Sequence, residues 1–197
     1  MTYYSAVIAT NGRYISRKNL IDIGNQEMKP LEKFFDNTKD VLEFGSGLGK
    51  NLICISDKMN TGYGLDINAL FIRIAKKLSK YYCVDNVTFL SYDGKTFPQL
   101  PKVDVVIEKG VFERLPRNLV QYYVQSLRQK YLKNHGQMIL YFLSERAKNS
   151  EFTMRLGDKA YVFWDKASVL KLLTTDLDLE LIEVQEWQYA DVYVVRG

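Results

Sequence analysis

Short apolar runs alternate with amphipathic stretches along most of this chain. The apolar runs have the length and character of buried strands, and they lie at 40–44, 61–66, 86–91 and 103–107. Between them, apolar residues recur every three or four positions, which predicts helices at 48–59, 68–82 and 117–132. Strands that alternate with helices indicate a mainly parallel sheet with helices on both faces.

The stretch at 68–82 shows the helical pattern clearly. Asn68 stands at the expected N-cap, because its side chain can accept a hydrogen bond from the unpaired N–H groups of the first turn. One face of the predicted helix carries the apolar residues Leu70, Ile74, Leu78 and Tyr81. We therefore expect this face to pack against the sheet.

The C-terminal third continues the pattern less regularly. His135-Gly136 predicts a break after the preceding helix, and the mixed-charge stretch 144–160 predicts a loop. Further elements are predicted at 138–143 (a fifth strand), 165–173 (a helix capped by Asp165), and 179–187 with 191–195 (an antiparallel pair). The expected fold is α/β: a three-layer sandwich with a seven-stranded, mostly parallel sheet and one antiparallel edge strand.

Length and composition favour one globular domain. The 197 residues are 47% hydrophobic and 25% charged, and we expect a single domain over 1–197 with an N-terminal cap segment at 1–37 and a core at 38–197. The net charge of +4 is too small to indicate a nucleic-acid partner. Two cysteines exclude a disulfide scaffold, and the sequence shows no transmembrane run or signal peptide, so a cytoplasmic location is expected.

Candidate chemistry centres on a glycine loop after the first predicted core strand. Gly45, Gly47 and Gly49 follow that strand and precede a predicted helix, so the backbone could approach a ligand closely. A phosphate-binding P-loop is excluded, because Phe44 and Asn51 stand where that motif needs Gly and Ser or Thr. A dinucleotide-binding loop stays open, although its third glycine comes one residue early.

A series of segments, in order, resembles the motifs of the class I S-adenosylmethionine-dependent methyltransferases. The segments are Glu43-x-Gly45-x-Gly47-x-Gly49, Tyr63-Gly64-Leu65-Asp66-Ile67, Ser91-Tyr92-Asp93-Gly94, Asp104-Val105-Val106-Ile107-Glu108, Val111-Phe112-Glu113-Arg114-Leu115-Pro116 and Leu132-Lys133-Asn134-His135-Gly136. The resemblance covers about residues 38–197 and implies a Rossmann-like fold. It also implies that the chain transfers methyl groups from S-adenosylmethionine, leaving S-adenosylhomocysteine.

The resemblance also implies roles for individual residues. The Asp66 carboxylate would accept hydrogen bonds from both ribose hydroxyls, and Asp93 would accept one from the adenine amino group. Ile67 would pack on the adenine. Glu108 would sit near the methionine portion, through its side chain or its carbonyl. The full set expected at the cofactor is Glu43, Phe44, Gly45, Ser46, Gly47, Asp66, Ile67, Asp93, Gly94 and Glu108.

The residues that carry the chemistry are less defined. Methyl transfer from a sulfonium depends mostly on alignment, so a general base is needed only for an acceptor that is protonated at the working pH. Candidates near the acceptor are Tyr4, Glu113 and Arg114, of which Arg114 replaces the histidine frequent in the family. Phe163 and Trp164 could form an acceptor wall, or simply pack. With a single histidine, no metal site is expected.

The acceptor itself is open. We expect a small molecule, methylated on oxygen or nitrogen, because the chain has little beyond the core to grip a polymer; RNA or protein acceptors stay as alternatives. A non-catalytic cofactor-binding or scaffold protein of the same fold is a second hypothesis. An oxidoreductase that uses a nicotinamide cofactor is a third. The sequence does not indicate an oligomeric state.

Overall fold

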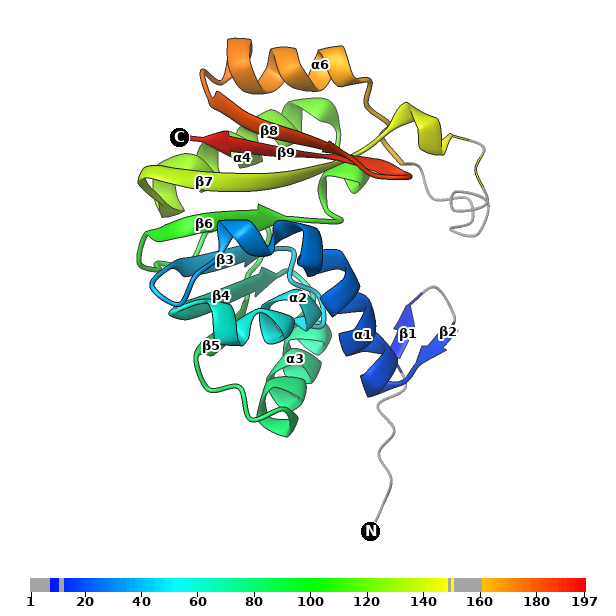
Figure 1. The fold of residues 1–197 in the computed structure, drawn as a ribbon, viewed down its shortest axis with the longest axis vertical. Coiled ribbons are helices and arrows are strands. Elements are labelled where there is room, and N and C mark those ends of the chain that lie inside the picture. The colour runs from blue at the N-terminus through cyan, green and yellow to red at the C-terminus, as the bar shows by residue number, and fades with distance from the viewer. Residues whose placement is uncertain (1–7, 11–12, 149, 151–160) are drawn as a thin grey trace. The chain divides into compact units, whose positions relative to one another are not determined.

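The structure is a computed structural model that describes residues 8–10, 13–148, 150 and 161–197 (Figure 1). Its strands are β1 (Ile8–Thr10), β2 (Arg13–Ile15), β3 (Asp40–Phe44), β4 (Thr61–Asp66), β5 (Val87–Ser91), β6 (Val103–Glu108), β7 (Leu132–Leu143), β8 (Glu180–Glu186) and β9 (Ala190–Arg196). Its helices are α1 (Arg17–Met28), α2 (Lys50–Cys54), α3 (Ala69–Tyr81), α4 (Arg117–Tyr131) and α6 (Lys166–Leu170). None of the helices in this described part is both long and apolar enough to span a bilayer.

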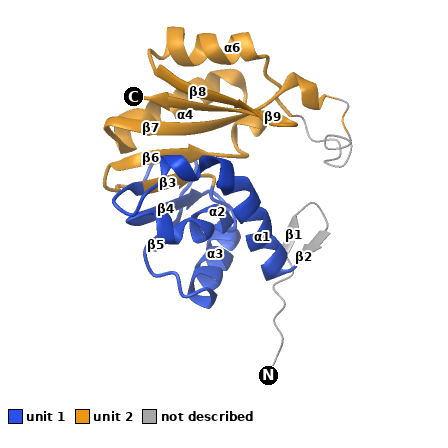
Figure 2. Ribbon diagram, viewed as in Figure 1, with its two compact units in different colours: residues 1–40, 46–98 blue, residues 41–45, 99–197 orange. Residues whose placement is uncertain are grey.

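The chain divides into two compact units (Figure 2). Unit 1 comprises residues 1–40 and 46–98, and unit 2 comprises residues 41–45 and 99–197. The expectation that 1–197 forms a single domain, with a cap segment at 1–37, stays a prediction.

Seven strands form one sheet in the order β5-β4-β3-β6-β7-β9-β8, which confirms the predicted α/β fold class. The pairs β4–β5, β3–β6 and β6–β7 are parallel, whereas β9 is antiparallel to both of its neighbours, β7 and β8. The antiparallel strand therefore lies one place inside the edge, and β8 forms the edge. Burial explains this order, because residues 191–195 of β9 are buried whereas β8 exposes the charged residues Glu180 and Glu186.

In unit 1, α3 packs on β4 and β5, but through a different face from the one expected. Leu78 is buried as predicted, whereas Leu70 is 52% and Tyr81 57% exposed. The buried face consists of Ile72, Ala75, Leu78 and Ser79. The small side chains Ala75 and Ser79 on this face let the helix approach the strands closely.

In unit 2, the strands β6, β7, β9 and β8 lie side by side (Figure 1). The amphipathic helix α4 packs on β6 and β7, and its buried apolar residues Val120, Val124, Leu127 and Tyr131 recur every three or four positions, as predicted for the helix over 117–132. The π-helical turn Lys171–Asp176 that follows α6 packs on β8. As predicted, the Asp165 side chain caps α6 by accepting from the Ser168 amide at 2.8 Å.

Two element boundaries differ from the prediction. The helix expected over 48–59 is only α2 followed by the 3₁₀ turn Ser56–Lys58. The fifth strand begins at Leu132 rather than at Met138, because the predicted break at His135-Gly136 is a bulge inside β7. His135 has a φ of +62° there, a conformation that lets the strand absorb extra residues and then resume its pairing.

Candidate active site

The glycine loop is fixed to the end of β4 within unit 1. The Ser46 amide donates to the Leu65 carbonyl at 2.9 Å, and the Gly47 amide donates to Oδ2 of Asp66 at 2.8 Å. The Asn68 amide donates to Oδ1 of the same carboxylate at 2.7 Å. Each oxygen of Asp66 thus accepts one backbone N–H and has a further acceptor position for a ligand hydroxyl.

The two glycines of this loop in unit 1 have different tasks. A Cβ on Gly49 would lie 2.4 Å from the Phe89 ring, so this glycine is required by packing. A Cβ on Gly47 would meet nothing within 4 Å, although the φ of Gly47 is +52°. Gly47 therefore combines an unusual backbone conformation with open space beside it, as expected where a ligand lies against the backbone.

Ile67 and Gly94 form a second part of the predicted site in unit 1. Ile67 is 67% exposed, which is unusual for a large apolar side chain. A Cβ on Gly94 would lie 3.6 Å from Cγ2 of Ile67, so the Gly94 backbone approaches this exposed side chain. Together they present an apolar patch and a backbone strip of the kind that a flat ring could cover.

Asp93 is engaged in its own turn. Its Oδ1 accepts from the amides of Lys95 at 2.8 Å and Thr96 at 2.6 Å. These backbone hydrogen bonds, with that to Thr96 the largest cause, hold the pKa of the Asp93 carboxyl below its ordinary value. Asp93 is therefore a fixed, ionised acceptor at the exposed end of the segment after β5.

In unit 2, Glu43 and Phe44 are buried at the end of β3, each 1% exposed. Gly45 follows with a φ of +77°, and a Cβ there would lie 2.0 Å from Cγ2 of Val111. The backbone of Gly45, the first glycine of the loop, therefore lies directly against the segment after β6. Gly45 is therefore required both by its backbone conformation and by packing.

Glu108 ends β6 and is fully buried. Its Oε1 accepts from the amides of Val111 at 2.8 Å and Phe112 at 3.1 Å, so the side chain caps the 3₁₀ turn Phe112–Arg114. Burial, and then the nearby carboxyl of Glu113, raise the pKa of Glu108 well above its ordinary value. Among the described residues, its Oε2 has no hydrogen-bond partner.

The acceptor-side candidates lie in the same turn. Burial raises the pKa of the Glu113 carboxyl, against the opposing effect of the nearby Arg114 and Lys109. Arg114 is exposed, and its Nε donates to the Gly110 carbonyl at 3.2 Å. Tyr4, the third candidate, lies outside the described residues.

The segment 161–164, Tyr-Val-Phe-Trp, lies close to this turn. The Val162 amide donates to the Glu113 carbonyl at 2.8 Å, and the Trp164 amide donates to the Leu143 carbonyl at 2.9 Å. Trp164 is 4% exposed and packed, as one of the two expectations for it required, whereas Phe163 is half-buried and its place in an acceptor wall stays a prediction. Sequence reasoning missed Tyr161, which the density of aromatic residues in this run could have indicated.

The predicted site residues thus fall into two groups. Unit 1 holds Ser46, Gly47, Asp66, Ile67, Asp93 and Gly94, and unit 2 holds Glu43, Phe44, Gly45, Glu108, Glu113 and Arg114. The side chain of Ser46 is buried, and its backbone N–H and carbonyl form hydrogen bonds with Leu65 and Gly49, so this residue supports the loop. The chain itself joins the groups between Gly45 and Ser46.

A family model described as a methyltransferase domain matches residues 35–178 of this chain. No match is found among curated protein sequences. The matched range includes every candidate residue above except Tyr4.

Solved structures share the fold at low sequence identity. A magnesium protoporphyrin IX methyltransferase from Synechocystis with bound SAH has a TM-score of 0.67 at 17% identity, over 89% of this chain and 81% of that one. A SAM-dependent methyltransferase from Aquifex aeolicus has a TM-score of 0.67 at 14% identity, over 92% and 98%. An O-methyltransferase family 2 protein from Planctomyces limnophilus in complex with apigenin has a TM-score of 0.67 at 11% identity, over 90% and 61%.

Proposed function

The chain belongs to the class I S-adenosylmethionine-dependent methyltransferases, and we propose that it methylates an oxygen or nitrogen of a small molecule. Membership of this family identifies the reaction as methyl transfer and the cofactor as S-adenosylmethionine. One point supports a small acceptor: the Planctomyces limnophilus protein of the same fold was solved in complex with apigenin.

The observation that carries the cofactor assignment is the contact between Gly47 and Asp66. It holds a carboxylate with remaining acceptor positions beside a glycine whose Cβ direction is open. We propose that Asp66 accepts the ribose hydroxyls and that the Gly47 backbone lies along the ligand. This donor and acceptor arrangement fits a ribose with two neighbouring hydroxyls.

Other residues of unit 1 fit the adenine. Ile67 offers an exposed apolar face to a flat ring, and Asp93 is an ionised acceptor for an exocyclic amino group. The Gly94 backbone runs beside Ile67, where its N–H could meet a ring nitrogen. In unit 2, Glu43 and Glu108 are the carboxyl groups proposed for the methionine portion with its ammonium.

When bound, the cofactor supplies a methyl group on a sulfonium, which is a good leaving group. The residues of the chain then have to hold and align the acceptor, because alignment accounts for most of the rate in such a displacement. Glu113 is the residue proposed to accept a proton, if the acceptor carries one. Its raised pKa brings the carboxyl closer to the range in which a general base works well.

Calorimetric titration tests this proposal. We expect S-adenosylmethionine and S-adenosylhomocysteine to bind and NAD not to bind. Asp66→Ala should weaken S-adenosylhomocysteine binding by about 1.5 kcal/mol or more, because hydrogen bonds to a charged group are lost. If neither sulfur ligand binds, the cofactor assignment is wrong for this chain. Binding of NAD instead would favour the oxidoreductase.

Screening of acceptors with a labelled methyl group tests whether the methyl acceptor is a small molecule. Transfer to a small-molecule pool, with none to RNA or protein, would support the proposal. Tight binding of S-adenosylmethionine without transfer to any acceptor class would instead support a binding or scaffold protein.

A further inference from the structure

The segment 161–164 forms an aromatic strap across the ends of two strands of unit 2. Three backbone hydrogen bonds hold it: Val162 N–H to the Glu113 carbonyl, Trp164 N–H to the Leu143 carbonyl, and Glu145 N–H to the Trp164 carbonyl at 3.1 Å. Glu113 follows β6, and Leu143 is the last residue of β7. Ligands of open α/β sheets bind at these carboxyl ends of parallel strands.

Each aromatic ring of the strap has a cation beside it. The Arg117 guanidinium lies 4.5 Å from the centroid of the Trp164 ring, and the Arg114 guanidinium lies 5.5 Å from that of Tyr161. The Lys148 ammonium lies 5.9 Å from the centroid of the Phe163 ring. The three cations come from three different elements, so the tertiary structure assembles this cluster.

The strap has hydrogen-bond donors that lack acceptors. Nε1 of Trp164 and the hydroxyl of Tyr161 are enclosed, yet neither has a hydrogen-bond partner among the residues that the structure describes. Arg114 and Arg117 donate to backbone carbonyls, those of Gly110 and Phe163, and no ion pair joins either arginine to a described carboxylate. The guanidinium groups of Arg114 and Arg117 are exposed and carry only donors, so they complement a ligand group that only accepts, as an anion does.

The carboxylates near the strap in the described part of the chain are already engaged. Glu145 pairs with Lys148 at 3.0 Å, and Asp165 accepts from the amide and the hydroxyl of Ser168. Glu113 is half-buried beside Arg114, but no ion pair joins these two described side chains. Of the three cations beside the strap, the two arginines are therefore the best placed to form an ion pair with a bound anion. Their planar guanidinium groups match the geometry of carboxylate and phosphate.

We propose that the aromatic strap, with Arg114 and Arg117, binds an anionic group on the methyl acceptor, and that the acceptor is an aromatic compound with a carboxylate or a phosphate. The arginines hold the anion, and the half-buried rings of Tyr161 and Phe163 contact the aromatic ring. This inference rests on the proposed small-molecule acceptor and specifies its chemical class.

The test measures binding at the strap directly by fluorescence. The protein has two tryptophans, so Trp187→Phe leaves Trp164 as the only tryptophan reporter. With S-adenosylhomocysteine at saturation, this variant is titrated with benzoate, phenyl phosphate and the neutral benzamide. We expect at least one anion to bind about tenfold more tightly than benzamide, and the stronger of the two anions shows which group is recognised.

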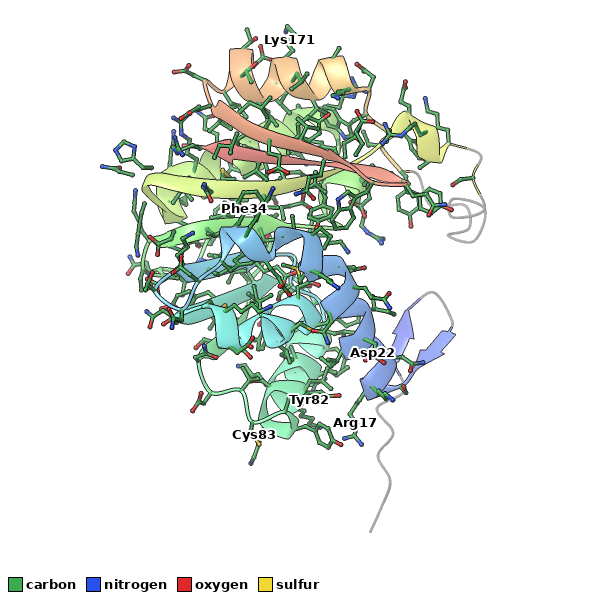
Figure 3. All side chains as sticks on the ribbon, in the orientation of Figure 1. Arg17, Asp22, Phe34, Tyr82, Cys83 and Lys171 are labelled. Atoms are coloured by element: carbon green, nitrogen blue, oxygen red, sulfur yellow. The ribbon has the colours of Figure 1, made fainter. Side chains whose placement is uncertain are left out.

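Arginine variants locate the effect. Arg114→Gln and Arg117→Gln should each weaken binding of the preferred anion about tenfold and leave benzamide binding unchanged. Lys171→Gln is the matched control, because it removes the same charge from a side chain that is 71% exposed on the turn after α6 (Figure 3). Melting temperatures of the variants check that each is folded.

Three results would overturn the inference: equal binding of benzamide and both anions, no fluorescence change with any probe, or an anion preference that survives both arginine changes. A separate titration with S-adenosylhomocysteine distinguishes these failures from a failure of the proposed function. If that ligand binds and the anion preference is absent, only the strap proposal is wrong.

Discussion

The backbone amide of Gly47 donates a 2.8 Å hydrogen bond to the carboxylate of Asp66, and this bond fastens the glycine loop to the end of β4. The two residues are 19 positions apart, and both belong to the predicted cofactor site. The carboxylate therefore fixes the loop, and we propose that it also accepts hydrogen bonds from the ligand.

Asp66→Asn tests whether Asp66 has a role that an ordinary surface aspartate does not have. The amide of asparagine turns one acceptor into a donor, which faces either the Gly47 or the Asn68 N–H group. We expect S-adenosylhomocysteine to bind about tenfold or more weakly, as measured by calorimetry. Asp57→Asn, an exposed aspartate in the same unit, is the control and should bind normally. Normal affinity in Asp66→Asn would remove the ribose role.

Gly45→Ala and Gly47→Ala should affect different properties. Alanine at 45 adds a clash with Val111 to a positive φ, so the free energy of unfolding should fall by about 3 kcal/mol. Alanine at 47 meets open space, so only the backbone cost of about 1 kcal/mol applies. The ligand should occupy that space, and Gly47→Ala should lose most of its S-adenosylhomocysteine affinity. Urea denaturation and calorimetry measure the two effects, and equal destabilisation by both alanines would contradict this division.

Glu108 should make stability depend on pH. Its pKa is raised in the folded state, so the folded protein binds more protons than the unfolded chain from about pH 4.5, the ordinary value, upward to the raised value. The free energy of unfolding should therefore fall as pH rises through this window. Glu108→Gln keeps an acceptor for the Val111 and Phe112 amides but does not titrate.

The difference between wild type and Glu108→Gln is the measured quantity. Urea denaturation at several pH values between 5 and 8 should show the variant gaining stability over wild type as pH rises, by at most about 1.4 kcal/mol per pH unit for one proton. Parallel curves for the two proteins would show that Glu108 titrates alike in the folded and unfolded states.

Asp191 and Arg146 form an ion pair near the start of β9. Asp191 is 2% exposed, and both of its oxygens accept from the Arg146 guanidinium, at 2.5 and 3.4 Å. Arg146→Ala should cost about 2 kcal/mol or more, because a buried carboxylate loses its partner. The double variant Arg146→Ala with Asp191→Asn should recover part of this loss. A loss below about 0.5 kcal/mol would place the pair with ordinary surface ion pairs.

The local sequence determined the order and type of most elements. Strand β3 ends at Phe44 and β4 ends at Asp66, as the apolar runs predicted, and Asn68 caps α3 through hydrogen bonds to two amides of its first turn. These features depend on residues a few positions apart, through backbone sterics and side-chain capping. The motif series likewise indicated the family, because ligand-binding loops keep their spacing along the chain.

Only the tertiary structure decided which faces are buried and which side chains meet. Periodicity predicted that the α3 face with Leu70 and Tyr81 is buried, but α3 packs on β4 and β5 through another face and leaves these two residues exposed. The burial of Glu108 and the gathering of Arg114 and Arg117 at the aromatic strap also arise between segments far apart in the sequence. Their energies come from packing and desolvation, which depend on distant neighbours and are therefore not encoded in any local pattern.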